Sequence, residues 1–204
     1  MVYAPRDDGG RDLLDIVARN EAITVTWLKS YLSFGEDRPL WALVADEVMA
    51  KKALADDLSV DEAIRRNMYL QSWRAKAVGE GSLGNDLKRM VKIADKLGVR
   101  QEALAVSRDA QRQAIIWYHK QSTANRQLFN ANRVNDCLKR KHKMMLVGDA
   151  EILTRKAQTN RHTSRRDCKC IACSDTRTAS GCAHPNQCFA KARTMLMSLL
   201  PKCC

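Results

Sequence analysis

The stretch Cys168-Lys-Cys170-Ile-Ala-Cys173, followed after eight residues by Cys182-Ala-His184-Pro-Asn-Gln-Cys188, decides how the C-terminal part of this chain folds. Thiolates crowded at such spacings are typical ligands of one tetrahedral zinc ion. The two residues between Cys170 and Cys173 form a tight turn, so both thiolates can bind the same metal ion. Two later sulfurs complete the four ligands. The candidate ligands are Cys168, Cys170, Cys173, Cys182, His184 and Cys188.

The simplest ligand set is Cys170, Cys173, Cys182 and Cys188, in which Cys168 or His184 could replace one member. Two metal ions would need more ligands than this cluster supplies. A site closed by four protein ligands has no open position for water, so the zinc is expected to stabilise the fold and not to catalyse hydrolysis. The alternative use of these cysteines is in disulfides or as free thiols.

The cellular location of the protein helps to decide between metal binding and disulfides. Residues 1–10 contain no apolar run that resembles a secretory signal, and no segment approaches the ~20 apolar residues that span a bilayer. We therefore expect an intracellular protein, cytoplasmic or nuclear, without a membrane partner. Thiols stay reduced in those compartments, which favours metal binding over disulfides.

The positive charge of the chain is confined to one half. Residues 1–104 hold 16 Lys and Arg against 17 Asp and Glu, whereas residues 105–204 hold 19 against 6, within a total net charge of +12. Such an excess favours a polyanionic partner, nucleic acid first and an anionic membrane surface second. The plain alternative is a solvated basic surface. The candidate nucleic-acid-binding residues are Arg133, Lys139, Arg140, Lys141, Lys143, Arg161, Arg165, Arg166 and Lys169.

Apolar residues recur mostly at helical spacing, which predicts a mainly α protein. Helices are expected over residues 11–19, 23–32, 39–52, 85–97, 107–119 and 131–142, from residue 147 onward, and after Cys188; a further helix is expected to begin at Ser59. The predicted organisation is a helical domain over 1–157 (near-neutral 1–104, basic 105–157), a basic linker over 158–167, and a Cys-rich zinc module with a terminal helix over 168–204.

No arrangement of residues predicts catalysis. The sequence lacks a phosphate-binding loop and a serine nucleophile motif, and acidic pairs such as Asp56-Asp57 and Asp61-Glu62 are typical of helix surfaces and caps. Each cysteine has a structural explanation, and His119 has no evident catalytic partner. We therefore expect that the chain is not an enzyme.

Several stretches resemble a known family. They are Ala22-Ile-Thr-Val-Thr-Trp27, Asp37-Arg-Pro-Leu-Trp41, Leu70-Gln-Ser-Trp73, Trp117-Tyr-His119, Cys137-Leu-Lys-Arg, Val147-Gly-Asp149 and the cysteine cluster through Pro201-Lys202. In this order they are similar to the region that precedes the ribonuclease H domain in predicted retroelement-like proteins (reverse transcriptase/ribonuclease H) of basidiomycete fungi.

The resemblance implies a segment that works on RNA, DNA or their hybrid beside reverse-transcription machinery, without the nuclease and polymerase domains. Two features depart from the family pattern: Asn186 follows Pro185 where the family has a histidine, and the chain ends in Cys203-Cys204 where relatives continue. The leading hypothesis is a non-enzymatic, zinc-binding, nucleic-acid-binding region. The alternatives are a protein-interaction or assembly module with a structural zinc, and a decayed fragment without a defined activity.

Overall fold

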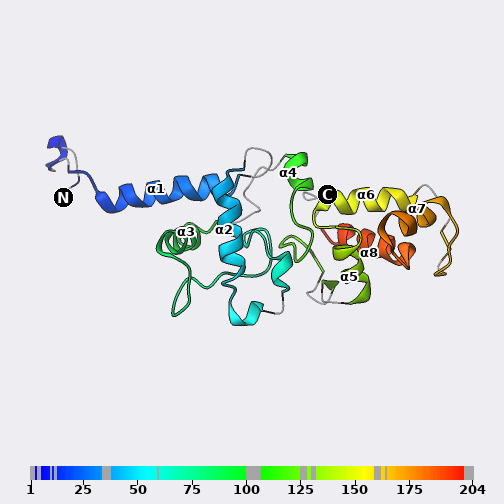
Figure 1. The fold of residues 1–204 in the computed structure, drawn as a ribbon. Helices are drawn as coiled ribbons and strands as arrows, with labels where there is room; N and C mark the ends of the chain where they lie inside the picture. Colours follow the sequence, from blue (N-terminus) through cyan, green and yellow to red (C-terminus); the bar gives the residue numbers. More distant parts are fainter. Residues whose placement is uncertain are drawn as a thin grey trace.

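The structure is a computed structural model that describes residues 3, 6–9, 11, 13–33, 38–58, 60–99, 107–124, 128–129, 132–158, 162–163 and 165–199. This part of the chain is mainly helical, and a Cys/His cluster near the C-terminus is followed by a helix, as predicted (Figure 1). The α-helices are α1 (Ile16–Tyr31), α2 (Leu40–Ala50), α3 (Asn85–Lys96), α4 (Arg108–Arg112), α5 (Arg133–Arg140), α6 (Val147–Gln158), α7 (Ile171–Ser180) and α8 (Pro185–Met197). Short 3-10 turns lie at η1 (Arg6–Asp8), η2 (Ala55–Asp57) and η3 (Glu62–Ile64).

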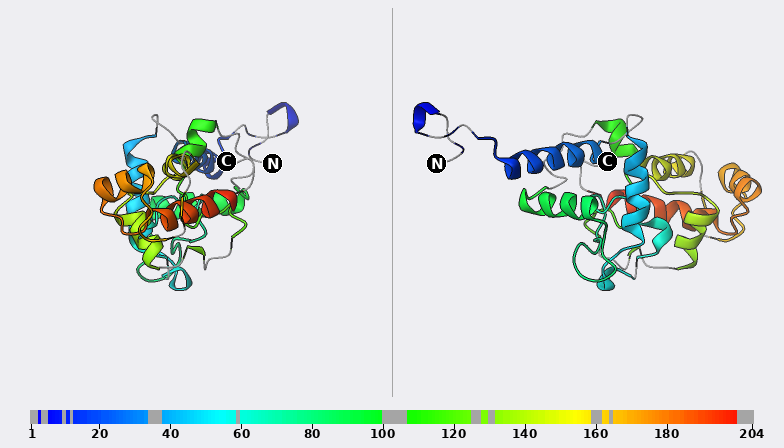
Figure 2. Two further views of the ribbon diagram at one scale, coloured as in Figure 1. Left: turned by 90° about the vertical axis from the view of Figure 1, so that its right-hand side faces the viewer. Right: turned by 60° about the vertical axis from the view of Figure 1, so that its left-hand side comes forward.

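The molecule is elongated, with α1, α2 and α3 toward one end and α5 to α8 toward the other (Figures 1 and 2). Helix α1 packs along α3, and its N-terminal part projects beyond the rest of the molecule. An ion pair of 2.6 Å joins Lys96 Nζ of α3 to Glu21 Oε1 of α1. Among the described residues, no helix is both long and apolar enough to cross a bilayer.

The first long helix differs from the prediction of separate helices over 11–19 and 23–32. A single helix α1 begins after Asp15, whose Oδ1 accepts hydrogen bonds from the backbone N–H groups of Val17 and Ala18 at 2.9 and 3.0 Å. This side-chain cap satisfies two donors that have no partner within the helix. Ser59, the expected start of another helix, lies outside the described residues. Between residues 60 and 84, which the structure describes, the helical structure is limited to the turn η3, capped by Asp61.

The helix predicted over 107–119 ends at Arg112, and residues 114–123 instead form a central segment of turns and isolated backbone bridges. Its backbone pairs with three remote parts of the chain: Gln71 opposite His119, Ile115 opposite Leu146, and Ser122 opposite Leu199. Trp117, fully buried, donates from Nε1 to the carbonyl oxygen of Met144 at 2.7 Å. Ile, Trp, Tyr and His are poor helix formers, so these remote hydrogen bonds prevail over a weak local preference.

The segments that precede the cysteine cluster pack with it into one unit. Helix α8 lies against α6, α5 and α7, so the terminal helix is the centre of this end of the molecule. Figure 2 shows α8 running through the unit in both further views. Of residues 158–167, predicted as a linker, the structure describes 158, 162–163 and 165–167, and His162 packs in that unit. Phe189, 1% exposed, anchors α8 in the shared core, where it contacts His162 with ring centroids 5.5 Å apart.

His119 makes stability depend on pH. It is 3% exposed, and burial lowers the pKa of its imidazole from 6.5 to about 4. Between these values the unfolded chain binds more protons than the folded one, so stability falls as pH falls. From pH 7.5 to 5.5 this group should lower the free energy of unfolding by about 1.3 kcal/mol.

The measurement is urea unfolding of the wild-type protein and the His119→Gln variant at both pH values. Glutamine keeps a side-chain acceptor for the backbone N–H of Gln121, which bonds His119 Nδ1 at 3.1 Å. Any metal release in acid affects both proteins alike. The decrease in unfolding free energy from pH 7.5 to 5.5 is therefore compared between the two proteins, and the difference is the contribution of His119. Equal falls would contradict the expectation.

Candidate metal centres

Two groups of four Cys and His side chains lie in the C-terminal unit, each with ligand atoms within 4.8 Å of one another. We call Cys137, His142, Cys182 and Cys188 the outer site, and His162, Cys168, Cys170 and Cys173 the inner site. All four inner-site residues fall between His142 and Cys182 in sequence, so the inner site is nested within the outer one. Either group could hold a metal ion.

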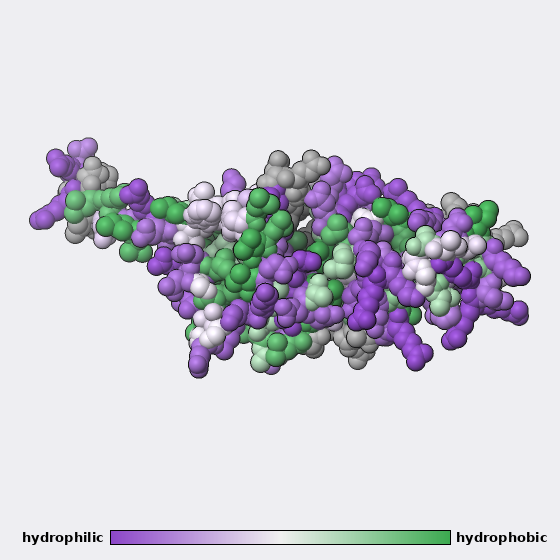
Figure 3. Space-filling model, viewed as in Figure 1, coloured by the Kyte–Doolittle hydropathy of each residue, from purple (hydrophilic) through white to green (hydrophobic). Residues whose placement is uncertain are grey.

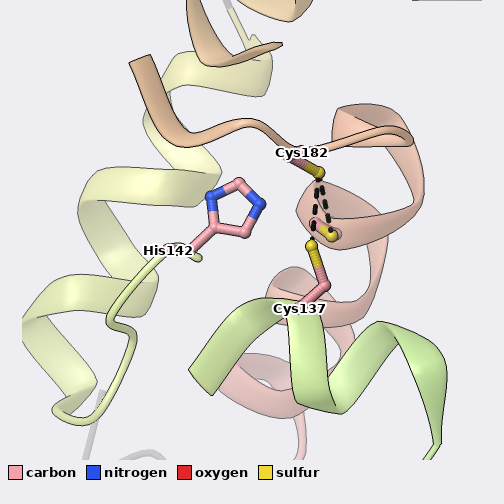
Figure 4. Close-up of side chains that lie close together, drawn as sticks. Cys137, His142 and Cys182 are labelled. Atoms are coloured by element: carbon pink, nitrogen blue, oxygen red, sulfur yellow. Dashed lines mark hydrogen bonds between the residues drawn. The ribbon is translucent and has the colours of Figure 1, made fainter. Parts of the chain in front are cut away.

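The outer site joins segments that are far apart in sequence. Cys137 projects from α5 and His142 from the segment after it, both toward Cys182 (Figure 4). Cys188 lies in the first turn of α8, where the helix dipole favours a thiolate. Gly181 directs the chain into this site because its φ of 64° ends α7 in a left-handed turn just before Cys182.

The inner site is local and is built around the start of α7. Cys170 is the N-cap of α7, and its Sγ accepts from the backbone N–H of Cys173 at 3.4 Å. His162 faces the same point: its Nδ1 lies 3.2 Å from Cys170 Sγ and 3.3 Å from Cys173 Sγ. Its other nitrogen, Nε2, lies 2.8 Å from the carbonyl oxygen of Ala157. A donor bond there leaves the Nδ1 lone pair free for a metal, as in many metal-bound histidines.

The spacing of the donor atoms fits a tetrahedral ion. A zinc ion with usual bond lengths separates two sulfurs by about 3.8 Å, and a sulfur from a nitrogen by about 3.5 Å. In the outer site Cys182 Sγ lies 3.5 Å from Cys137 Sγ and 3.7 Å from Cys188 Sγ. The inner-site sulfur–nitrogen distances are 0.2–0.3 Å shorter than the ideal value. Three sulfurs and one imidazole nitrogen form a common structural zinc set.

The chemistry of the isolated groups also fits a metal. In the outer site, burial raises the pKa values of Cys188 and Cys137, and the neighbouring thiols raise them further. In the inner site, burial and the adjacent cysteines raise the pKa of Cys173 to about 12, whereas backbone N–H donors of Cys170 and Thr163 lower the pKa of Cys168 to about 5. Cysteine binds a metal as a thiolate, so metal uptake displaces protons from the thiols whose pKa is raised.

The histidine of the outer site is also in a form that can bind a metal. Burial lowers the pKa of His142, helped by the positive charges of Lys156 and Lys141. The imidazole therefore stays neutral at pH 7, which is the form that binds a metal. Its Nε2 is buried and has no hydrogen-bond partner among the residues that the structure describes. A buried nitrogen without a partner is costly, and a metal ion would satisfy it.

Arg177 holds the inner-site loop against α7. Its two terminal nitrogens donate to the carbonyl oxygens of Cys168 and Arg166, both at 2.7 Å. Two fixed carbonyls set the path of the chain that carries Cys168 toward the other ligands. A neutral imidazole and three thiolates leave a metal(II) site with a net charge of −1, and this guanidinium partly offsets it.

The structure divides the expected single zinc ligand set between the two sites. Cys170 and Cys173 belong to the inner site, whereas Cys182 and Cys188 belong to the outer site. Cys168, expected as a substitute ligand, completes the inner site. His184 joins neither group: it is the N-cap residue of α8, with a buried Nδ1 that has no partner in the described part of the chain. The expectation that ligands would be too few for two ions fails because three more residues contribute.

Those three residues, Cys137, His142 and His162, were missed by sequence reasoning. Cys137 occupies an apolar position of a predicted helix, and His142 follows a run of basic residues. His162 lies in the segment that the sequence predicts to be a linker. The available signal was spacing: Cys137-x4-His142 and His162-x5-Cys168 resemble halves of zinc sites, but their partners are recognisable only once α5 packs on α8.

The predicted basic residues fall into three classes. Exposed side chains belong to Arg133, Arg140, Lys141, Lys143, Arg165, Arg166 and Lys169, and Arg161 lies outside the described residues. Lys139 differs because its side chain is only 11% exposed and lies over the ring of Trp117, 5.3 Å from the centroid. It also pairs with Asp61 and Asp136 at 3.7 and 3.9 Å, so its role in the fold is structural.

No protein-family model matches this sequence, and comparison with curated proteins and with solved structures gives no match either.

Proposed function

We propose that this chain is a non-enzymatic nucleic-acid-binding unit, stabilised by two zinc ions. The observation that carries the proposal is the coincidence of both metal sites with an unneutralised basic surface. The exposed cations Arg133, Arg140 and Lys143 lie on and after α5, which also supplies the outer-site ligand Cys137. Arg166 and Lys169 flank the inner-site ligand Cys168.

Zinc is the metal favoured by the donor set. Each site offers three sulfurs and one imidazole, and soft thiolate ligands at tetrahedral spacing select zinc over magnesium or calcium, which prefer oxygen. Each site uses four protein ligands, so the ion would have no open position for water or substrate. Its contribution would be to hold the basic segments in place, with no part in a reaction.

The charge on this surface supports a phosphate partner. Arg133, Arg140, Lys143, Arg165, Arg166 and Lys169 are exposed, and none of them forms an ion pair with a carboxylate among the described residues. Figure 3 shows hydrophilic side chains over much of the end that holds α5 to α8. Cations without carboxylate partners are available to replace the counterions of a nucleic-acid backbone.

The resemblance to retroelement-like proteins supports a role beside reverse transcription. Two of its stretches contribute to the core and to a candidate metal site: Trp117 is buried in the central segment 114–123, and Cys137 belongs to the outer site. In Val147-Gly-Asp149, Asp149 accepts from the backbone N–H groups of Met145 and Leu146 and so caps α6. We propose on this basis that the chain derives from a retroelement protein.

Salt-dependent binding tests the nucleic-acid proposal. The dissociation constants for short labelled RNA, single-stranded DNA and duplex DNA are measured by fluorescence anisotropy from about 50 to 200 mM salt. The triple variant Arg133→Gln, Arg140→Gln, Lys143→Gln should reduce the slope of log K against log salt by about 2 to 3 on duplex DNA, since each lost phosphate contact removes about 0.9.

The matched control removes three exposed lysines from the near-neutral half: Lys29→Gln, Lys51→Gln, Lys52→Gln. It lowers the net charge by the same amount and should leave the slope nearly unchanged. Affinity that does not depend on salt, or equal losses in the two triple variants, would refute binding through the α5 surface.

A further inference from the structure

The opposite end of the molecule carries a surface of a different character. Helix α2 turns Ala42, Ala45 and Met49 into the core and leaves four large apolar side chains outside. These four, Leu40, Leu43, Val44 and Val48, recur at helical spacing and form what we call the α2 ridge. Leu40 and Val44 are 80% and 63% exposed. Figure 3 shows hydrophobic side chains along α2 on the face toward the viewer.

A groove adjoins the ridge. It lies between α1 and α3, has a volume of about 850 Å³, and is lined by Val17, Trp27, Trp41 and Met90 among others. Trp41 connects the two features, because its ring lines the groove while its backbone is the second residue of α2. Trp27, 54% exposed, stands edge-on to Trp41 with ring centroids 5.2 Å apart. Charged residues such as Glu21, Arg89 and Lys92 also line the groove.

We infer that the α2 ridge and the adjoining groove bind a second copy of this chain, forming a two-fold symmetric dimer. An apolar centre with charged groups around it is the usual anatomy of a protein–protein interface, and exposed tryptophan is enriched at the positions that dominate binding. The ridge alone is too small for the roughly 800 Å² that each partner contributes to a standard interface, but the groove extends it.

Charge selects this occupant. The two carboxylates of α2 are already engaged: Asp46 is buried and paired with Arg38 at 2.7 Å, and Glu47 pairs with Arg66 at 2.6 Å. Helix α2 contains no lysine or arginine, so the ridge offers the phosphates of a nucleic acid no cation to bind. Residues 1–104 are nearly neutral, with 16 basic and 17 acidic residues, so two copies can meet through this half without the repulsion that their basic halves would create.

The dimer goes beyond the proposed function and would strengthen it. Contact through the N-terminal halves leaves both basic ends free, and two linked binding surfaces raise the effective affinity for a long polyanion. The apolar contact itself does not weaken with salt, whereas binding to nucleic acid does. The two interactions therefore separate experimentally.

The test is the mass of the nuclease-treated, zinc-loaded protein in about 0.5 M salt, where nucleic-acid bridging is suppressed, by sedimentation over a concentration series. We expect a species of twice the 23.0 kDa chain mass. The double variant Leu40→Ser, Val44→Ser should self-associate roughly 100-fold more weakly. Both positions are largely exposed, so the variant should keep its helix content, which far-UV circular dichroism verifies.

The matched control is Ile171→Ser, since Ile171 is 70% exposed but lies in the basic half; this variant should dimerise like the wild type. A wild-type protein that remains monomeric at every concentration overturns the proposal. A dimer that the double variant does not weaken overturns it as well. A monomer that instead binds an amphipathic helical peptide through the ridge would assign the surface to a different protein and would equally overturn it.

Discussion

The purified protein should contain two zinc ions per chain, and the Cys137→Ser variant should contain one. Cys137 supplies one of four outer-site donors, and a serine hydroxyl is a poor substitute for a thiolate at zinc. The inner site draws all four ligands from residues 162–173 and should keep its ion. Elemental analysis of exhaustively dialysed protein measures both numbers.

Two further variants make the assignment specific. Cys173→Ser should likewise lower the content to one zinc, now by loss of the inner site. His184→Gln is the control, because His184 lies beside the cysteines in sequence but belongs to neither group; it should retain two ions. A single zinc in the wild type, lost with Cys173→Ser but retained with Cys137→Ser, would show that one site forms from the C-terminal cysteines alone.

The helical character of the fold could be predicted because it depends on local periodicity. The apolar positions of α3 and α8 recur every three or four residues. The predicted bounds of α3 nearly match those of the structure, whereas α8, expected after Cys188, begins earlier at Pro185. The central segment 114–123, with its turns and isolated bridges, could not be predicted this way. Its side chains are spaced like those of a helix, but its backbone hydrogen bonds join Gln71, Leu146 and Leu199 to it across the chain. Only tertiary packing specifies such a segment.

The ligand sets illustrate the same limit. The cysteine cluster at residues 168–188 indicated metal binding, because thiols crowded at these spacings are typical zinc ligands. Its division into two sites depends on the packing of α5 against α8. The spacing of cysteines along the sequence carries no information about that packing. Cys137 gave a signal that was equally typical of a small buried apolar residue, since free cysteine is often buried for packing alone.

Because the inner site lies within the outer one in sequence, the two sites stabilise different parts of the fold. The inner site fixes a short loop at the start of α7, whereas the outer site ties α5 to the start of α8 and closes the chain between His142 and Cys182. Closing a loop of about 40 residues removes more entropy from the unfolded chain than closing a loop of about six, by about 1.7 kcal/mol. The outer site therefore also determines how the exposed cations of α5 stand relative to those of the inner-site loop.

Removal of both metals should unfold α5 to α8 and leave α1 to α3 folded. Helices α5 to α8 hold roughly half of the described α-helical residues, and buried Cys182 and Cys188 lie at their centre. Without metal, the bonds that join these helices are lost. The buried Cys188 is then a neutral thiol, because its pKa is raised, and the buried Nε2 of His142 has no partner among the described residues. The core of α2 and α3, with Met49 and Met90, contains no ligand. A strong chelator should thus lower the far-UV helical signal by up to about half.

Hydrogen exchange locates the change: amides of α5, α7 and α8 should lose protection, while those of α3 keep it. Zinc added back should restore both signals, and magnesium should not, because it prefers oxygen ligands and octahedral geometry. The Cys137→Ser variant should show the loss in α5 without chelator, since α5 is tied to α8 through that ligand. A metal-free protein with unchanged helicity and exchange would mean that packing of α8 against α6 suffices for the fold, and the sites would then have to serve something other than stability.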